Sequence, residues 1–313
     1  MNIVPIVFSF NHFVTMPACI CLHSLLLNSN KDTYYDIFII HGEDELIDDD
    51  KKQLRSLEKS HKRFEITFIN IGNKFDNVYT ARGVPKVTYY RILIPDLITK
   101  YEKVIFADVD IIFTGDLSSI YFDTNLKDYY LAAVKTPGLK RKYVKSLGCD
   151  PDNYSSGGFQ IYNLPLCREH NISKKQLDLC GNEYFYLDQD ITNIVCKGKI
   201  KFISPAYNST QTFYSIANND KNSILNNYSE KEIYEGLNPI IIHYNGLNPW
   251  QGLCFRHDLW WETYRSSIFF DEVFYFSHFN KILNPSWKFL IQKLPKSLLN
   301  NKFKLFYRKI FPW

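Results

Sequence analysis

The chain has 313 residues, enough for one large domain or two small ones, with 45% hydrophobic and 22% charged residues, an ordinary globular composition. No apolar run approaches the length needed to span a bilayer, which excludes a membrane-spanning protein. The net charge of +4 is uneven, because residues 281–313 hold seven Lys and one Arg with no acidic residue, so the remaining body is mildly acidic.

The first half of the chain alternates strand-like and helix-like segments. The expected strands are 3–10, 36–40, 64–69 and 103–107, and the expected helices are 18–27, 46–59 and 89–98. This order predicts a largely parallel α/β sheet wrapped by helices, with ligands at the carboxyl ends of the strands. The apolar segment 3–10 has no preceding basic residue and contains Pro5, so we interpret it as the first strand and not as a signal peptide.

The second half is less regular. Strands are expected at 129–134, 158–162 and 239–243, and a helix at 187–196. The polar, Asn-rich segment 208–229 is expected to be a loop. The simplest division is a catalytic domain at 1–265 followed by an appendage at 266–313.

Seven cysteines are scattered along the chain without any CxxC pair. Their odd number and wide spacing argue against a disulfide framework or a zinc site. We therefore expect reduced core thiols in a cytosolic protein.

Two carboxylates interrupt an apolar run at residues 104–113. Alternation along a strand would direct Asp108 and Asp110 to the same face. Two ionised carboxylates so close repel each other unless one is protonated or a cation lies between them, and a divalent ion with oxygen ligands resolves the conflict. The alternative is that the strand ends at Ala107 and both acids are solvated turn residues.

The surroundings of this triplet resemble a known family. Residues 101–117 resemble the metal-binding segment of glycosyltransferase family 8, the retaining enzymes of the GT-A fold. Four further segments resemble family motifs in type, order and spacing, at 87–91, 155–164, 186–190 and 242–250. The resemblance covers residues 3–265 and implies a Rossmann-like, mixed, mainly parallel sheet flanked by helices.

The resemblance also implies roles for individual residues. Asp108, Asp110 and His243 would ligate Mn²⁺ or Mg²⁺. The donor substrate would be a UDP-hexose, in contact with Phe10, Asn11, Arg91, Asp108, Ser156, Gly246 and Asn248. Asp188 and Gln189 would lie at the donor sugar and the reaction face, whereas Asp190 points elsewhere on the helix and is expected to be structural. Structural alternatives remain open at this point: a hydrogen-bonded strand end for His243, an ion pair for Arg91 and a turn for Gly246.

Three positions depart from the family pattern. Residues 8–14 stand where the family usually carries an acidic pair, an Asn and a Tyr that hold the base and ribose, although Asn11 can still hydrogen-bond a uracil edge and Phe10 or Phe13 can stack on it. Ser156 replaces an Asn near the sugar. Asn248 replaces a phosphate-binding Lys, a loss for which Lys135, Lys140 or Arg141 would have to compensate.

The basic tail interleaves its eight cations with aromatic residues. This pattern favours attachment to an anionic membrane surface, and the alternative is a terminal helix docked on the body. The acidic body argues against nucleic acid as a partner. We therefore expect a cytoplasmic enzyme held peripherally at the inner face of the cell membrane.

The leading hypothesis is a metal-dependent, retaining hexosyltransferase that moves galactose or glucose from a UDP-sugar to a glycan or glycolipid acceptor. Lipopolysaccharide, lipooligosaccharide or another surface glycan is the expected acceptor. Because Gln189 is a poor nucleophile, same-face substitution is favoured over double displacement. The alternatives are a non-catalytic nucleotide-sugar-binding or scaffold protein, and a nucleotidyltransferase or hydrolase using the same acids.

Overall fold

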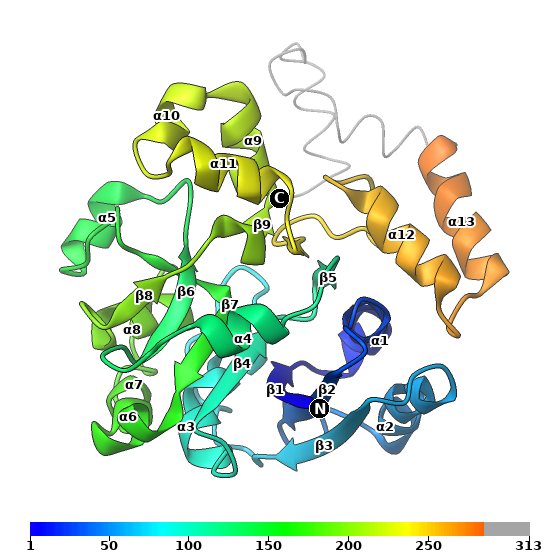
Figure 1. The fold of residues 1–313 in the computed structure, drawn as a ribbon, viewed down its shortest axis with the longest axis horizontal. Helices are drawn as coiled ribbons and strands as arrows, with labels where there is room; N and C mark the ends of the chain where they lie inside the picture. Colours follow the sequence, from blue (N-terminus) through cyan, green and yellow to red (C-terminus); the bar gives the residue numbers. More distant parts are fainter. Residues whose placement is uncertain (285–313) are drawn as a thin grey trace, which may run out of the picture.

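The computed structural model describes residues 1–284, which fold around a seven-stranded sheet (Figure 1). The order along this sheet is β3-β2-β1-β4-β7-β6-β8. Its strands are β1 (Asn2–Ser9), β2 (Thr33–His41), β3 (Phe64–Asn70), β4 (Lys103–Ala107), β6 (Leu131–Lys135), β7 (Ser155–Asn163) and β8 (Ile200–Phe202). Within this sheet only β7 runs antiparallel to its neighbours, so the mixed, mainly parallel α/β sheet predicted from the sequence is confirmed.

Helices cover both faces of the sheet because β1, β2 and β4 are apolar on both faces. One face packs against α1 (Thr15–Leu27), α2 (Asp48–Arg55), η2 (Ser56–Lys59) and α4 (Ser118–Asp123). The other packs against η3 (Lys86–Leu93), α3 (Ile94–Leu97), α6 (Leu164–Glu169), α7 (Ile172–Leu177) and α8 (Asp188–Val195). In β1, Ile6 and Phe8 belong to the first core and Val7 to the second, as strand alternation requires.

A second, three-stranded sheet extends from the first. It consists of β5 (Ile111–Phe113), β10 (Ile241–His243) and β9 (Ser209–Thr210), with β10 in the middle. β10 is antiparallel to β5, and its register places His243 opposite Ile111. The last residue of β10 is therefore fixed beside the residues that precede β5.

The strand order changes direction at β1. The chain adds β2 and β3 on one side of β1 and then returns to place β4 on the other side. Crevices form outside the carboxyl ends of strands at such a switch point. Here those ends are Ser9 of β1 and Ala107 of β4, which directly precedes Asp108.

The prediction of a loop at 208–229 is wrong. This segment contains β9, α9 (Gln211–Asn219) and α10 (Lys221–Leu225), followed by α11 (Glu230–Leu237). Its polar residues cap helices: the Thr210 hydroxyl accepts a hydrogen bond from the Phe213 N–H, and Asp220 accepts one from Ser223. A few apolar side chains spaced along the segment are sufficient to form a small core around Phe213 and Tyr228.

The expected helix at 89–98 also differs in kind. The chain forms the 3-10 helix η3 and then the short α3, which has Pro95 in its first turn. Proline is favoured there because the first helical N–H groups have no intrahelical acceptor. The remaining elements are η1 (His12–Val14), α5 (Arg141–Ser146), η4 (Pro205–Tyr207), α12 (His257–Ser266) and α13 (Glu272–Leu283).

The start of the basic appendage packs on the body. The Trp261 ring of α12 contacts four side chains of α13, including His278 at 4.4 Å and Phe279 at 5.2 Å between ring centroids. Within residues 1–284, no helix is both long enough and apolar enough to cross a membrane. The membrane segment predicted for the tail lies mostly beyond residue 284, outside the described residues, so the division at 265/266 stays a prediction.

The seven cysteines are free thiols, and all except Cys254 are buried. Burial raises the pKa of Cys167 and of Cys180 to about 12. Their thiolates are therefore disfavoured and chemically quiet. This placement in the core agrees with the sequence-based expectation.

Two histidines join α1, η2 and α12. His23 Nδ1 lies 2.9 Å from His61 Nε2, and His23 Nε2 lies 3.3 Å from Ser266 Oγ. Burial, aided by His61, lowers the pKa of His23 to about 4. The unfolded chain therefore takes up a proton first as the pH falls, so folding stability is lost between about pH 6.5 and pH 4.

We expect His23→Gln to flatten this pH dependence. From pH 7 to pH 4.5 the wild type should lose about 2–3 kcal/mol more unfolding free energy than the variant. Urea unfolding at a series of pH values measures both slopes. Parallel curves for the two proteins would show that His23 does not stay neutral in the folded state.

Candidate active site

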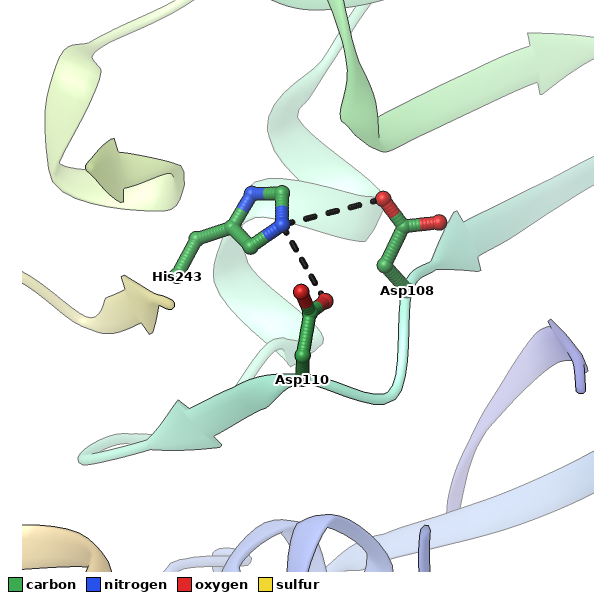
Figure 2. A group of neighbouring side chains, drawn as sticks. All are labelled: Asp108, Asp110 and His243. Atoms are coloured by element: carbon green, nitrogen blue, oxygen red, sulfur yellow. Dashed lines mark ion pairs between the residues drawn. The ribbon is translucent and has the colours of Figure 1, made fainter. Parts of the chain in front are cut away.

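Two aspartates and one histidine converge at the switch point. His243 Nε2 lies 3.1 Å from Asp110 Oδ1 and 3.8 Å from Asp108 Oδ2 (Figure 2). One potential ligand atom from each of the three residues lies within 4.8 Å of the other two. The side chains of Asp108 and Asp110 remain 27% and 30% exposed, so the cluster is open to a ligand from one side.

The aspartates do not share a strand, so the alternation argument for their common direction is wrong. β4 ends at Ala107 and β5 begins at Ile111, and residues 108–110 form the bend between them. Backbone bonds fix this bend: the Asp108 N–H donates to Gly158 O at 3.0 Å, and the Tyr244 N–H donates to Asp110 O at 2.9 Å. The two acids therefore meet in a constrained bend against His243, and not in a solvated turn.

Asn208 orients the His243 ring, and sequence reasoning missed it. Asn208 Nδ2 donates to Ser156 Oγ at 2.8 Å, which turns Asn208 Oδ1 towards His243 Nδ1, also at 2.8 Å. Because Nδ1 then carries a proton, the Nε2 lone pair of a neutral His243 faces Asp108 and Asp110. A hydrogen-bond acceptor on the ring nitrogen that faces away from the metal is typical of metal-binding histidines. No sequence pattern indicated this role of Asn208, because it is the first residue of the Asn-rich segment that we expected to be a loop.

Gly158 leaves room for this arrangement. A Cβ at Gly158 would lie 3.0 Å from Asn208 Oδ1 and would overlap the His243 ring. We expect Gly158→Ala to lower metal affinity by about 10–100-fold, because the ring must leave its ligating position. Gly115→Ala is the matched control, since its Cβ would meet Ile240 at an ordinary 3.4 Å. Calorimetric Mn²⁺ titration of both variants tests this, and unchanged affinity in Gly158→Ala would contradict it.

The charge state of the cluster suits a divalent cation. Desolvation raises the pKa of Asp108 despite Arg91 and His243. Desolvation also acts on Asp110, but the neighbouring His243 outweighs desolvation and lowers the pKa of Asp110. Burial would lower the pKa of His243, but the neighbouring Asp110 outweighs burial and raises it. Neighbouring ligands around an octahedral ion with ~2.1 Å bonds lie ~3 Å apart, close to the spacing observed here. The residues therefore fit Mn²⁺ or Mg²⁺, and imidazole with carboxylates suits Mn²⁺ well.

Arg91 joins the metal cluster to the sugar-side residues. Arg91 is 3% exposed; its Nη2 lies 2.9 Å from Asp108 Oδ1 and its Nε lies 3.1 Å from Asp188 Oδ2. It also donates to the backbone carbonyls of Thr88 and Gly157. Its ion pairs are thus internal to the site, and the guanidinium fixes two carboxylates at once.

Asp188 and Gln189 begin α8 and face the same cavity. Leu187 precedes them with φ 51° and ψ −127°, a conformation that costs free energy for a residue with a branched side chain. Burial raises the pKa of Asp188 to about 6, although Arg91 opposes the shift. Gln189 Nε2 donates to Thr136 Oγ1 at 3.2 Å.

Asp190 holds the strained turn in place. It is fully buried and accepts hydrogen bonds from the Tyr143 hydroxyl at 2.7 Å, the Tyr186 N–H at 2.7 Å and the Tyr154 hydroxyl. Asp190 does not line the cavity described below. Its role is to anchor the segment that carries Asp188 and Gln189.

Most of the predicted site residues line one cavity of about 660 Å³. The predicted residues that line it are Phe10, Arg91, Asp108, Asp110, Ser156, Asp188, Gln189, His243, Gly246 and Asn248. Asn11 does not line this cavity. Phe10 does, but its side chain is fully buried in the core beside α1, so its ring is not open for stacking. The base contacts predicted for these two residues thus have the weakest structural basis.

The cavity wall near Gly246 contains an unpaired group. Asn248 Oδ1 is buried and has no hydrogen-bond partner among the described residues. Gly246 adopts φ +146°, a conformation suited to glycine. Of the cations expected to compensate at Asn248, Arg141 is held by Asp152 at 2.7 and 2.8 Å, and neither Lys135 nor Lys140 lines the cavity. The exposed cation in its wall is Arg82, which sequence reasoning did not single out.

Comparison with known proteins gives a consistent result. Residues 5–254 match the family model described as "Glycosyl transferase family 8". The chain is 24% identical over 89% of its length to a lipopolysaccharide 1,3-galactosyltransferase of Salmonella typhimurium, of which it covers 80%. The structure of an active-site mutant of LgtC is similar to this chain, with a TM-score of 0.73 at 20% identity over 87% of this chain and 99% of that one. The WbbM bifunctional glycosyltransferase has a TM-score of 0.72 at 23% identity over 90% of this chain, but the match spans only 52% of that longer protein. These structural likenesses show the GT-A fold.

Proposed function

The chain belongs to glycosyltransferase family 8, and from that premise we propose that it moves a hexose from a UDP-sugar to a glycan acceptor with retention at the anomeric carbon. The observation that carries this proposal is the placement of Asp108, Asp110 and His243 in one cavity with Asp188 and Gln189. A metal cluster at one end and polar sugar-binding groups at the other match the two halves of a nucleotide sugar. The cavity volume of about 660 Å³ lies within the range of small-molecule sites.

The donor diphosphate is assigned to the metal end. Asp108, Asp110 and His243 would hold Mn²⁺ or Mg²⁺, and a bound ion would supply Lewis-acid stabilisation of the charge that develops on the leaving diphosphate. Gly246 would let the backbone approach that group closely. The unpaired Asn248 Oδ1 and its side-chain amide offer hydrogen bonds but no charge, so leaving-group stabilisation is expected to be weaker than with a Lys at this position.

The donor sugar is assigned to the region between Arg91 and α8. Asp188, held by Arg91, would accept hydrogen bonds from sugar hydroxyls, and Ser156 would contact the sugar from β7. Gln189 would lie beside the anomeric carbon. Because Asp188 already pairs with Arg91 through Oδ2, it is poorly placed to act as a free nucleophile.

Retention is therefore assigned to same-face substitution. The bond from the anomeric carbon to the diphosphate oxygen breaks, and a bond to the acceptor oxygen forms on the same face. The acceptor hydroxyl proton passes to the departing diphosphate. Trapping of a glycosyl-enzyme adduct on Asp188 would contradict this mechanism in favour of double displacement.

The acceptor is proposed to be a cell-surface glycan precursor, such as lipopolysaccharide or lipooligosaccharide, met at the inner face of the membrane. The named activity of the Salmonella relative supports this choice. An exposed apolar face of α13 supports membrane attachment in addition to the composition of the basic tail. Its residues Val273, Phe276 and Leu283 are 80%, 64% and 76% exposed and recur at helical spacing. Such a face, together with the eight cations of residues 281–313, suits peripheral binding to an anionic surface.

A non-catalytic nucleotide-sugar-binding protein is the second candidate, because Asn248 carries no charge and Asn11 lies outside the cavity wall. Thermal unfolding with a panel of nucleotide sugars, each with and without Mn²⁺, identifies the donor. Product formation from the radiolabelled donor then separates the two functions. Transfer to a glycan supports the enzyme, whereas metal-dependent binding without turnover supports the binding protein.

A further inference from the structure

Two exposed cations meet at one aromatic ring beside the cavity. The Arg82 guanidinium lies 4.1 Å from the centroid of the Phe185 ring, and Lys140 Nζ lies 3.7 Å from the same centroid. Arg82 also donates to the Phe185 carbonyl and lines the cavity itself. Segments that are distant in the sequence thus place two positive charges around one side chain.

Neither cation is neutralised by an acidic side chain of the part of the chain that the structure describes. Among residues 1–284, Arg82 and Lys140 form no ion pair, whereas nearby Arg141 pairs with Asp152 and Lys86 pairs with Asp76. Two uncompensated positive charges held around one ring attract an anionic group. The cation–π contacts hold both groups in position without satisfying their full hydrogen-bonding capacity.

The ring that positions these cations is itself well anchored. Phe185 contacts Tyr186 edge-on at 4.8 Å and Tyr143 at 5.7 Å between ring centroids. The Phe185 N–H donates to the Tyr143 hydroxyl at 2.7 Å, and that hydroxyl bonds the buried Asp190. The pair of cations is therefore presented on a fixed aromatic support.

This support lies on the Gln189 side of the cavity. Phe185 lies four residues before Gln189 in the same anchored segment, and the Lys140 N–H donates to the Tyr186 hydroxyl at 3.1 Å. Gln189 in turn bonds Thr136, four residues before Lys140. The metal-ligand candidate Asp108 is linked to this segment through Arg91, which pairs with both Asp108 and Asp188.

We propose that Arg82 and Lys140 form an anion-binding site at the mouth of the cavity that takes a phosphate or carboxylate group of the acceptor glycan. This assignment rests on the proposed transferase function and narrows it, because it makes the acceptor an acidic glycan. Arg82 offers a planar fork of N–H donors to such a group, and Lys140 adds a point charge. The donor diphosphate contains the same chemistry, so the test must separate the two sources.

Glucose 6-phosphate and glucose are suitable probes, because they differ only in the anionic group. Their affinities are measured by calorimetry or NMR on the full chain, both without nucleotide and with UDP and Mn²⁺ saturating the donor site. The variants are Arg82→Gln, Lys140→Gln and the double variant. Lys142→Gln is the matched control, since it removes the same charge from an exposed position on α5.

We expect the wild type and Lys142→Gln to bind glucose 6-phosphate at least about tenfold more tightly than glucose, and the double variant to lose this preference. UDP affinity with Mn²⁺ should stay within about twofold in every variant. Equal binding of the two sugars by the wild type would overturn the site. A loss of UDP affinity in the double variant would overturn the acceptor assignment and give the cations to the donor. Failure of UDP to bind in the presence of Mn²⁺ would count against the proposed transferase function. The titrations of glucose 6-phosphate and glucose without nucleotide would still show whether the anion site exists.

Discussion

Replacing Asp110 with Asn is expected to abolish Mn²⁺-dependent stabilisation and to lower the rate of glycosyl transfer by about 10²–10³-fold. The substitution is nearly isosteric, and the new side-chain amide can still form a hydrogen bond with His243 Nε2, which lies 3.1 Å from Asp110 Oδ1. It removes one of the two negative charges that make this cluster attractive to a divalent ion. The metal-free fold should therefore change little, whereas the response to metal should disappear.

Thermal unfolding with and without Mn²⁺ measures the first effect, and radiolabelled sugar transfer measures the second. Asp128→Asn is the control, because it removes the same charge from an exposed position far along the chain. Retained Mn²⁺ stabilisation in Asp110→Asn would show that the ion binds at another site. Retained stabilisation together with full activity would overturn the metal site altogether.

The sequence predicted the metal site for partly incorrect reasons. Ordered motifs and their resemblance to a family singled out Asp108, Asp110 and His243, and the structure brings these three together. The strand-alternation argument failed because β4 ends at Ala107, and a bend gives no regular periodicity of side-chain direction. What places the two acids is the pairing of β5 with β10, a contact between segments about 130 residues apart in the chain that local patterns cannot show.

Other errors also have local causes. Asn208 was expected in a loop because Asn and Ser are turn-forming residues, yet the same residues cap helices when apolar side chains nearby can be buried. Phe10 was expected to stack on a base because it follows the first strand, but the neighbouring α1 covers its ring completely. Which side of a strand end remains open depends on the helices packed there, and this is a property of the tertiary structure.

The sheet itself was predicted with good accuracy. Continuous apolar runs identified β1, β2 and β4, because strands buried on both faces need apolar residues at most positions, whereas the edge strand β3 alternates apolar and polar residues. Arg91 shows the limit of such patterns. Its ion pairs with Asp108 and Asp188 depend on three segments, and only their convergence shows that one guanidinium links these two carboxylates.

Arg91→Met is expected to lower the free energy of unfolding by about 3–5 kcal/mol and to remove most transferase activity. Both carboxylates that Arg91 contacts face the cavity, and their pKa values are already raised by desolvation, that of Asp188 to about 6. Without the guanidinium, ionised Asp108 and Asp188 would lose the cation that compensates their burial. The destabilisation should be larger above pH 6, where Asp188 is ionised, and smaller below it.

Two further variants separate the charge effect from the loss of packing. Arg91→Met combined with Asp188→Asn should recover part of the lost stability, since one uncompensated carboxylate is then neutral, but it should recover no activity. Arg141→Met is the control, because it breaks a bidentate pair with Asp152 that is exposed on both sides and should change stability far less. Urea unfolding at pH 5 and pH 8 measures these differences. Equal destabilisation by Arg91→Met and Arg141→Met would mean that the buried guanidinium is not the charge that holds the two halves of the site together.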